Sequence, residues 1–155
     1  MAASTSSNNT GKWRSALRNS TGRLSSRSSQ SIALESELDP RVATLSHVTI
    51  YTDVPHATLQ SIINIAVETY NKFVLVPTRN TWRKEEGARK ELEREVERAA
   101  LRDIAKMIKE NVESALGGTW HVIYGRSFST YVTHQTRSFC HFQLDGANVV
   151  VWRHG

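Results

Sequence analysis

The last third of the chain, residues 119–155, contains four runs of strand-forming residues separated by short turn signals. The runs are TWHVIYG at 119–125, the middle of GRSFSTYVTHQTRSF at 125–139, FCHFQL at 139–144 and NVVVWRH at 148–154. Asp145-Gly146, which separates the last two, is a dipeptide typical of a two-residue hairpin turn. We therefore expect this third of the chain to form antiparallel strands.

The run within 125–139 differs from an ordinary half-buried strand. Tyr131, Val132 and Thr133 favour a strand, but alternate positions do not separate into an apolar and a polar face. Such a strand must be buried by something other than simple packing of a sheet on a helix. It could cross to another subunit, accept an incoming strand along its edge, or do both, and these alternatives stay open on the residues alone.

A strand and two helices are predicted before this region. HVTIYTDV at 47–54 favours a strand that ends at Pro55, and residues 56–73 carry apolar side chains at helical spacing. A long helix is predicted from 83 to the Gly117-Gly118 stop signal, with a charged first half expected to be a solvated extension. The order β-α-α-β-β-β-β predicts an α+β fold, an antiparallel sheet with two helices on one face.

The formal charge of +5 lies at the N-terminus. Of the 20 lysines and arginines, five precede the first acidic residue, and the remaining 15 equal the 15 acidic residues. Residues 1–40 are rich in Ser, Thr and Asn, so we expect a disordered tail followed by one domain at 41–155. An Arg-rich, Ser-rich leader is also typical of an organelle transit peptide, which would be cleaved.

No pattern of catalytic or metal-binding residues is evident. His134, Cys140 and His141 lack the paired spacing of a zinc site, and adjacent strand residues such as Cys140 and His141 point to opposite faces. Phosphate-binding loops, HExxH and GxSxG motifs are absent. We expect a binding protein with no catalytic residue, metal or cofactor; an enzyme or metal-binding protein that uses these three residues is the alternative. The longest apolar run is too short for a membrane span, and five dispersed tail charges do not predict nucleic-acid binding.

The block TWHVIYGRSFSTYVTHQTRSF resembles the corresponding segment of the small cytoplasmic dynein light chains, a family of dimeric hub proteins. The similarity runs without gaps from about residue 101 to 155 and includes RDIAKMIKE, and a weaker similarity covers 47–73. Residues from about 75 to 99, the connector and the charged half-helix, look like an insertion between the two family helices.

The resemblance implies a strand-swapped homodimer in which the 128–134 strand pairs with the partner's sheet. Its free edge would then accept an extended peptide, often of a Thr-Gln-Thr type, as an added strand. The implied peptide-binding groove comprises Arg102, Phe128, Ser129, Thr130, Tyr131, Val132, Thr133, His134, Phe139, His141 and Gln143. The implied dimer interface includes Lys109, His121, Tyr131 and Thr133.

Several positions depart from the family pattern. His141 and Gln143 replace groove-floor tyrosines, Leu101 replaces a helix-start glutamate, and Asn148 and Ser129 replace an alanine and a glycine. We therefore expect the dimer and the strand-addition mode to persist, with an altered peptide preference.

The implied partners are short motifs of disordered proteins, the dynein intermediate chain among them. The implied setting is a cytoplasmic dynein motor complex on the microtubule cytoskeleton. The alternative is an organelle-targeted or dynein-independent dimerisation hub.

Overall fold

The computed structural model describes residues 38–81 and 83–154, so the predicted tail lies outside the described residues except for positions 38–40. The elements in chain order are η1 (Pro40–Thr44), β1 (His47–Thr52), α1 (His56–Tyr70), η2 (Asn71–Leu75), η3 (Arg79–Thr81), α2 (Glu86–Leu116), β2 (Trp120–Gly125), β3 (Phe139–Leu144) and β4 (Ala147–Arg153). η2 is a π-helical turn that continues α1, and η1 and η3 are 3-10 turns.

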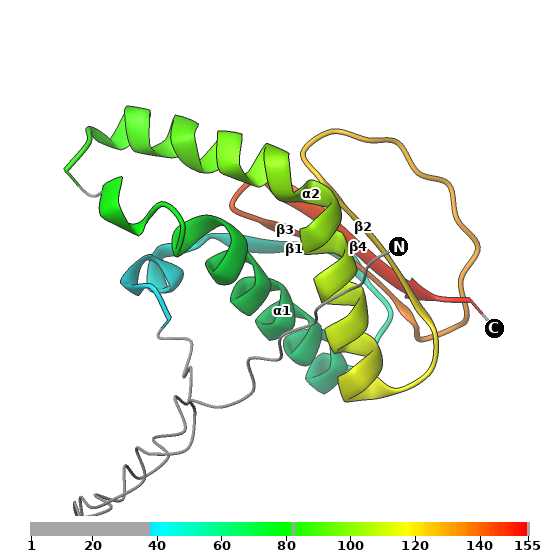
Figure 1. Ribbon diagram of the computed structural model, residues 1–155. Helices are drawn as coiled ribbons and strands as arrows, with labels where there is room; N and C mark the ends of the chain where they lie inside the picture. Colours follow the sequence, from blue (N-terminus) through cyan, green and yellow to red (C-terminus); the bar gives the residue numbers. More distant parts are fainter. Residues whose placement is uncertain (1–37, 82, 155) are drawn as a thin grey trace, which may run out of the picture. The chain divides into compact units, whose positions relative to one another are not determined.

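The four strands form one antiparallel sheet in the order β1-β3-β4-β2. The α+β prediction is therefore confirmed, with α1 and α2 together on one face (Figure 1). The Asp145-Gly146 turn joins β3 to β4 with positive φ at both residues, as a type I′ hairpin requires. Gly117, at φ 69°, ends α2 where a stop was predicted.

The core lies between the two helices and the sheet. Alternate residues of β3 and β4, such as Phe142 and Val149, face the helices and are fully buried. They meet apolar side chains that recur at helical spacing, including Ile62 on α1 and Ile104 and Ile108 on α2. No helix in the described part of the chain is long and apolar enough to cross a membrane.

The predicted strand at 128–134 is not a strand within this chain. Residues 126–138 leave the end of β2, sweep away from the sheet as an open loop and return at β3 (Figure 1). A strand exists only where a neighbouring strand accepts its backbone hydrogen bonds. The chain itself supplies no such neighbour in its described part.

The first half of α2 is not the solvated extension that the sequence predicts. Glu93 and Glu97 are only 2% and 1% exposed. Glu93 accepts a hydrogen bond from Arg41 Nη1 at 2.6 Å, and Glu97 accepts bonds from Tyr124 and Arg126. This half-helix is therefore attached to the domain through ion pairs whose carboxylates are buried and whose arginines are partly exposed. The helix also begins at Glu86, three residues later than expected, with Glu85 as its N-cap.

Asp39 fastens the described N-terminus to the helices. Its carboxylate accepts bonds from Arg41 and Arg79, and its backbone N–H donates to Asn71 Oδ1 at 2.9 Å. The hydrogen bond from the Arg41 side chain holds the pKa of Asp39 at about 2, below its ordinary value.

A pH-dependent loss of stability follows from this low pKa of Asp39. The ionised form contributes stability at pH values above the unfolded-state pKa of about 4, and this contribution is lost as the pH falls toward 2. We expect Asp39→Asn to lower the free energy of unfolding by about 1–2 kcal/mol at pH 7. Urea unfolding at a series of pH values should show the gap between wild type and variant closing between pH 4 and pH 2. A gap that is constant across this range would contradict the assignment.

Candidate functional site

The middle of the 126–138 segment presents a backbone without backbone partners. Within the described residues, no backbone–backbone hydrogen bond involves positions 127–134. Tyr131 is fully exposed, and Val132 and His134 are partly buried. A row of free N–H and C=O groups on strand-forming residues is a template for pairing with another chain.

The two ends of this segment are fixed to the domain. At the start, Arg126 donates to Glu97, and its own carbonyl accepts a bond from Asn148 Nδ2 at 3.2 Å. At the end, the Asp53 carboxylate accepts bonds from the backbone N–H groups of Arg137, at 2.8 Å, and Phe139, at 2.7 Å. The segment is therefore an open span between two fixed points.

The edge of β2 beside this segment is also unpaired. β2 pairs with β4 along one side, and the described residues contain no strand on its other side. The sheet thus ends in a free edge from Trp120 to Gly125, and the segment that would extend it begins at the next residue.

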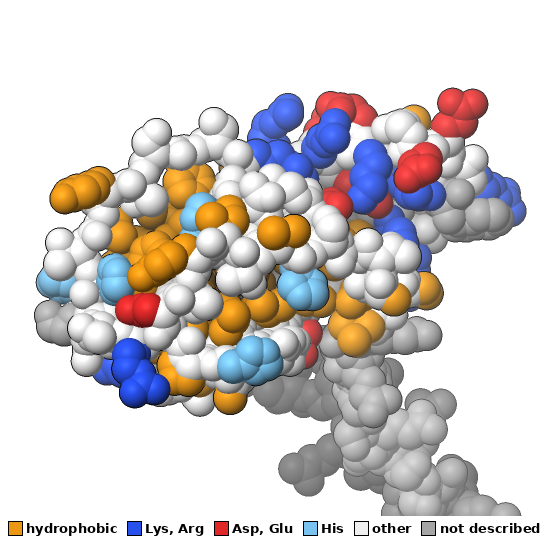
Figure 2. Space-filling view, turned by 180° about the vertical axis from the view of Figure 1, so that it is seen from behind, with side chains coloured by type: hydrophobic (Ala, Val, Ile, Leu, Met, Phe, Trp, Pro, Cys, Tyr) orange, Lys and Arg blue, Asp and Glu red, His pale blue; other side chains and the backbone are white. Residues whose placement is uncertain are grey.

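The sheet face opposite the helices is the second exposed feature, and we call it the open sheet face. Cross-strand partners share a face, so the register assigns to it the following residues. They are Val48, Tyr51, His121, Ile123, Phe139, His141, Gln143, Asn148, Val150 and Trp152. Apolar and histidine side chains gather on this face, whereas charged side chains gather over the first half of α2 (Figure 2). Val48 and Tyr51 are 58% and 55% exposed, and they belong to a contiguous apolar patch on this face (Figure 2), a feature that marks an interaction surface.

Polar and aromatic contacts connect several of the predicted site residues. His141 Nε2 lies 3.1 Å from Asn148 Oδ1, which also accepts a bond from Gln143 Nε2 at 3.3 Å. The rings of His134 and Phe139 lie 4.7 Å apart, and His121 stacks on Trp152 at 5.2 Å. The three departures from the family pattern at 141, 143 and 148 therefore form one hydrogen-bonded group.

The remaining predicted residues lie apart from this group. Phe128 is partly buried, and Ser129, Thr130 and Thr133 are exposed on the open span. Arg102 is exposed on α2. Lys109 donates to Glu113 and to the carbonyl of Trp120 at 2.8 Å, so it connects the end of α2 to the start of β2.

Sequence reasoning missed the residues that hold the segment, namely Asp53, Glu97 and Arg126. Glu93 and Glu97 continue the spacing of the buried stripe that includes Ile104 and Ile108, so the i, i+4 periodicity carried a usable signal. Nothing in the sequence around Asp53 distinguishes it from an ordinary turn residue at the end of a strand.

Cys140 and His141 point to opposite faces of β3, as adjacent strand residues must. Cys140 is fully buried against the helices, whereas His141 lies on the open sheet face. In the ranges 38–81 and 83–154, no three His, Cys, Asp or Glu side chains are grouped to hold a metal ion. These positions keep the thiol of Cys140 away from the imidazole of His141.

The buried thiol should be unreactive in the native protein. Burial raises the pKa of Cys140 to about 12, so the nucleophilic thiolate is scarce at neutral pH. We expect modification by a thiol-specific disulfide reagent at pH 8 to be at least 100-fold slower in the native state than in urea. Rapid modification of the native protein would contradict this placement.

The family model described as dynein light chain type 1 matches residues 46–154, which is most of the chain. The chain belongs to the dynein light chain family. The match begins just before β1 and ends just after β4, so it includes every strand and both long helices. The family resemblance inferred from the YVTH block is confirmed.

Individual relatives of this dynein light chain match over a shorter length. Dynein light chain 1, cytoplasmic, of Candida glabrata is 44% identical over 52 residues, or 34% of this chain and 60% of the relative. The cytoplasmic dynein light chain of Emericella nidulans is 38% identical over 52 residues, or 34% of this chain and 55% of the relative. The chain thus spans somewhat more than half the length of these relatives.

Among solved structures, the dynein light chain-like domain of the Fasciola hepatica calcium-binding protein FhCaBP2 aligns with a TM-score of 0.47 and 15% identity, covering 74% of this chain and 96% of that domain.

Proposed function

We propose that this protein is a non-catalytic, dimeric dynein light chain that binds short linear motifs by adding them as strands to its sheet. The main support for the proposal is that two adjoining segments of the chain both lack backbone hydrogen-bond partners. The strand-forming residues 127–134 have no backbone partner, and they adjoin the free edge of β2, which has none either.

In the proposed dimer, each chain donates residues 128–134 to the β2 edge of its partner. Donation satisfies the backbone of the span and leaves its outer rim unpaired. The apolar side chains of the open sheet face, Val48 and Tyr51 among them, support burial against a second copy. Lys109, His121, Tyr131 and Thr133 are the interface residues proposed on the family pattern.

The groove for the peptide is proposed along the outer rim of the donated strand. Phe128 to His134 supply the backbone, and Phe139, His141 and Gln143 supply side chains beside it. Leu101 lies well inside α2, where its backbone N–H is used within the helix, so no helix N-terminus faces a ligand there. Together with the His141, Gln143 and Asn148 group, this supports a peptide preference that differs from that of the family.

The proposed cellular role is that of a cytoplasmic dynein subunit in microtubule-based processes, with the dynein intermediate chain among its partners. Both fungal relatives are named as cytoplasmic dynein light chains. Two grooves on one dimer would hold two disordered chains together through bivalency. A dimerisation hub outside dynein, or in an organelle, is the alternative. We also propose that residues from about 75 to 99 are an insertion in the domain at 41–155.

A panel of short synthetic peptides built around a Thr-Gln-Thr core, with each flanking position varied, tests the proposed function. Titration calorimetry with the purified full chain should give two peptides per dimer. Binding of no peptide, or of one per dimer, would contradict the proposal. Scrambled peptides of equal composition serve as the control, because strand addition through alternate pockets depends on sequence order.

A further inference from the structure

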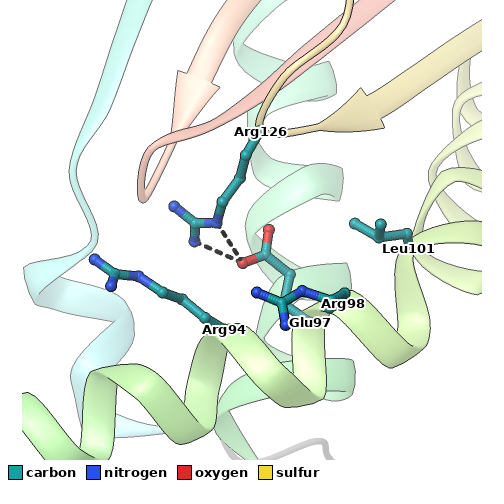
Figure 3. A pocket seen from close by; sticks show the side chains of 5 residues that line it. All are labelled: Arg94, Glu97, Arg98, Leu101 and Arg126. Atoms are coloured by element: carbon teal, nitrogen blue, oxygen red, sulfur yellow. Dashed lines mark hydrogen bonds and ion pairs between the residues drawn. The ribbon is translucent and has the colours of Figure 1, made fainter.

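Three arginines line a pocket beside the first half of α2. Arg94, Glu97, Arg98, Leu101 and Arg126 line a cavity of about 180 Å³, with Arg94 and Arg98 on either side of Glu97 (Figure 3). We call it the arginine pocket. Arg94 and Arg98 come from successive turns of α2, and Arg126 comes from the start of the 126–138 segment.

The arginine pocket carries more positive charge than its own carboxylate offsets. Both oxygens of Glu97 are used: Oε1 accepts from Tyr124 at 2.8 Å, and Oε2 accepts from Arg126 at 2.6 and 3.1 Å. Arg94 is 54% exposed and, among the residues that the structure describes, has an ion pair only with the exposed Glu91, at 3.5 Å. Arg98 has no ion pair among the described residues. Like charges four residues apart on a helix repel one another, so this arrangement favours an added anion.

The arginine pocket lies at one end of the proposed groove. Arg126 directly follows the free edge of β2, to which the donated strand would pair. A peptide added outside that strand would lie two strand spacings, or about 10 Å, from β2. The long side chains of Arg94 and Arg98 are exposed on α2, and they share the pocket with Arg126 at this end of the edge.

We propose that the arginine pocket binds an anionic group, a carboxylate or a phosphate, carried by a peptide in the groove. Guanidinium groups bind both anions through paired, charge-assisted hydrogen bonds, and the cavity has room for either group. The inference rests on the proposed function and adds to it a preference for acidic or phosphorylated residues next to the core motif.

The test uses fluorescence anisotropy with the purified 155-residue chain and Thr-Gln-Thr peptides in four matched versions. At each flanking position in turn, the peptide carries Glu, Gln, phosphoserine or Ser. The protein variants are Arg94→Gln, Arg98→Gln and the double variant. Lys106→Gln is the matched control because Lys106 is exposed on α2 outside the pocket. Arg126 is left unchanged because it also binds Glu97.

At one flanking position, wild-type protein should bind an anionic peptide roughly tenfold more tightly than its neutral counterpart. Lys106→Gln should keep this ratio, and the double variant should reduce it to about one. The affinity of the Glu peptide is divided by that of the Gln peptide, and the affinity of the phosphoserine peptide by that of the Ser peptide. The larger of these two ratios identifies the preferred anion as a carboxylate or a phosphate. Equal binding of charged and neutral peptides, or a charge preference that survives in the double variant, overturns the inference and leaves strand addition intact. If no peptide binds the wild-type dimer, the proposed function fails and the inference fails with it.

Discussion

Replacing both Tyr131 and Val132 by proline should convert the protein from a dimer of about 35 kDa, twice 17.5 kDa, into a 17.5 kDa monomer. Proline has no backbone N–H, and neighbouring N–H groups of a strand point to opposite edges, so the pair blocks both sides of the donated strand. Each dimer contains two such strands, and losing about 1.4 kcal/mol at each weakens association roughly 100-fold. Sedimentation equilibrium at micromolar concentration measures the change.

The variant should keep its own fold, because residues 127–134 pair with nothing in the described part of their own chain and Tyr131 is fully exposed. Circular dichroism tests this directly. The matched control is Tyr131→Phe with Val132→Thr, which alters both side chains and preserves both N–H groups, and it should remain a dimer. A proline variant whose dimer dissociation constant equals that of the wild type would exclude donation of this strand.

Replacing Glu97 by alanine should give the largest loss of stability among the charged residues of α2. The change leaves the Tyr124 hydroxyl buried without its acceptor and removes the carboxylate partner of Arg126. Breaking a fully buried ion pair costs about 3–5 kcal/mol, but the Arg126 side chain is 37% exposed and regains some hydration. We therefore expect the free energy of unfolding to fall by about 3 kcal/mol in urea titrations.

Two control variants distinguish a stability loss caused by the broken hydrogen bonds of Glu97 from one caused by a change in helix propensity. Glu95→Ala changes an exposed residue on the same helix and should alter stability by less than about 0.5 kcal/mol. Glu97→Gln keeps an acceptor for Tyr124 and should lose less stability than Glu97→Ala. Equal effects of Glu95→Ala and Glu97→Ala would show that Glu97 contributes nothing through burial.

Elements with a strong local pattern were predictable from the sequence. The helical spacing of the apolar side chains at 56–73 matches the buried residues of α1, since this spacing alone decides which side chains share a face. Asp145-Gly146 and Gly117 ended their elements as predicted because each takes a positive φ.

The first half of α2 was not predictable in this way. Glu93 and Glu97 look solvated because charged residues are rarely buried without partners. Their partners Arg41 and Arg126 are 52 and 29 residues away in sequence, and no local pattern indicates such contacts. The same holds for Asp53, which contacts Phe139 from 86 residues away.

The candidate site was predictable only in part. The strand-forming residues at 128–134 were evident from the sequence. A strand also requires a neighbouring strand, and the residues of the segment itself do not indicate which strand that is. The contacts of His134 with Phe139, and of His141 and Gln143 with Asn148, link residues that the family pattern had grouped. The arginine pocket could not be predicted from the family pattern. Arg94 and Arg98 lie in the first half of α2, which the family pattern does not include.

The most direct measurement is an isotope-filtered NOE experiment on dimers that combine one labelled with one unlabelled chain. Strand exchange predicts cross-strand contacts between residues 128–134 of one chain and Trp120–Gly125 of the other. Contacts confined to a single chain, or a span that remains without any neighbour, would contradict exchange of this strand between subunits.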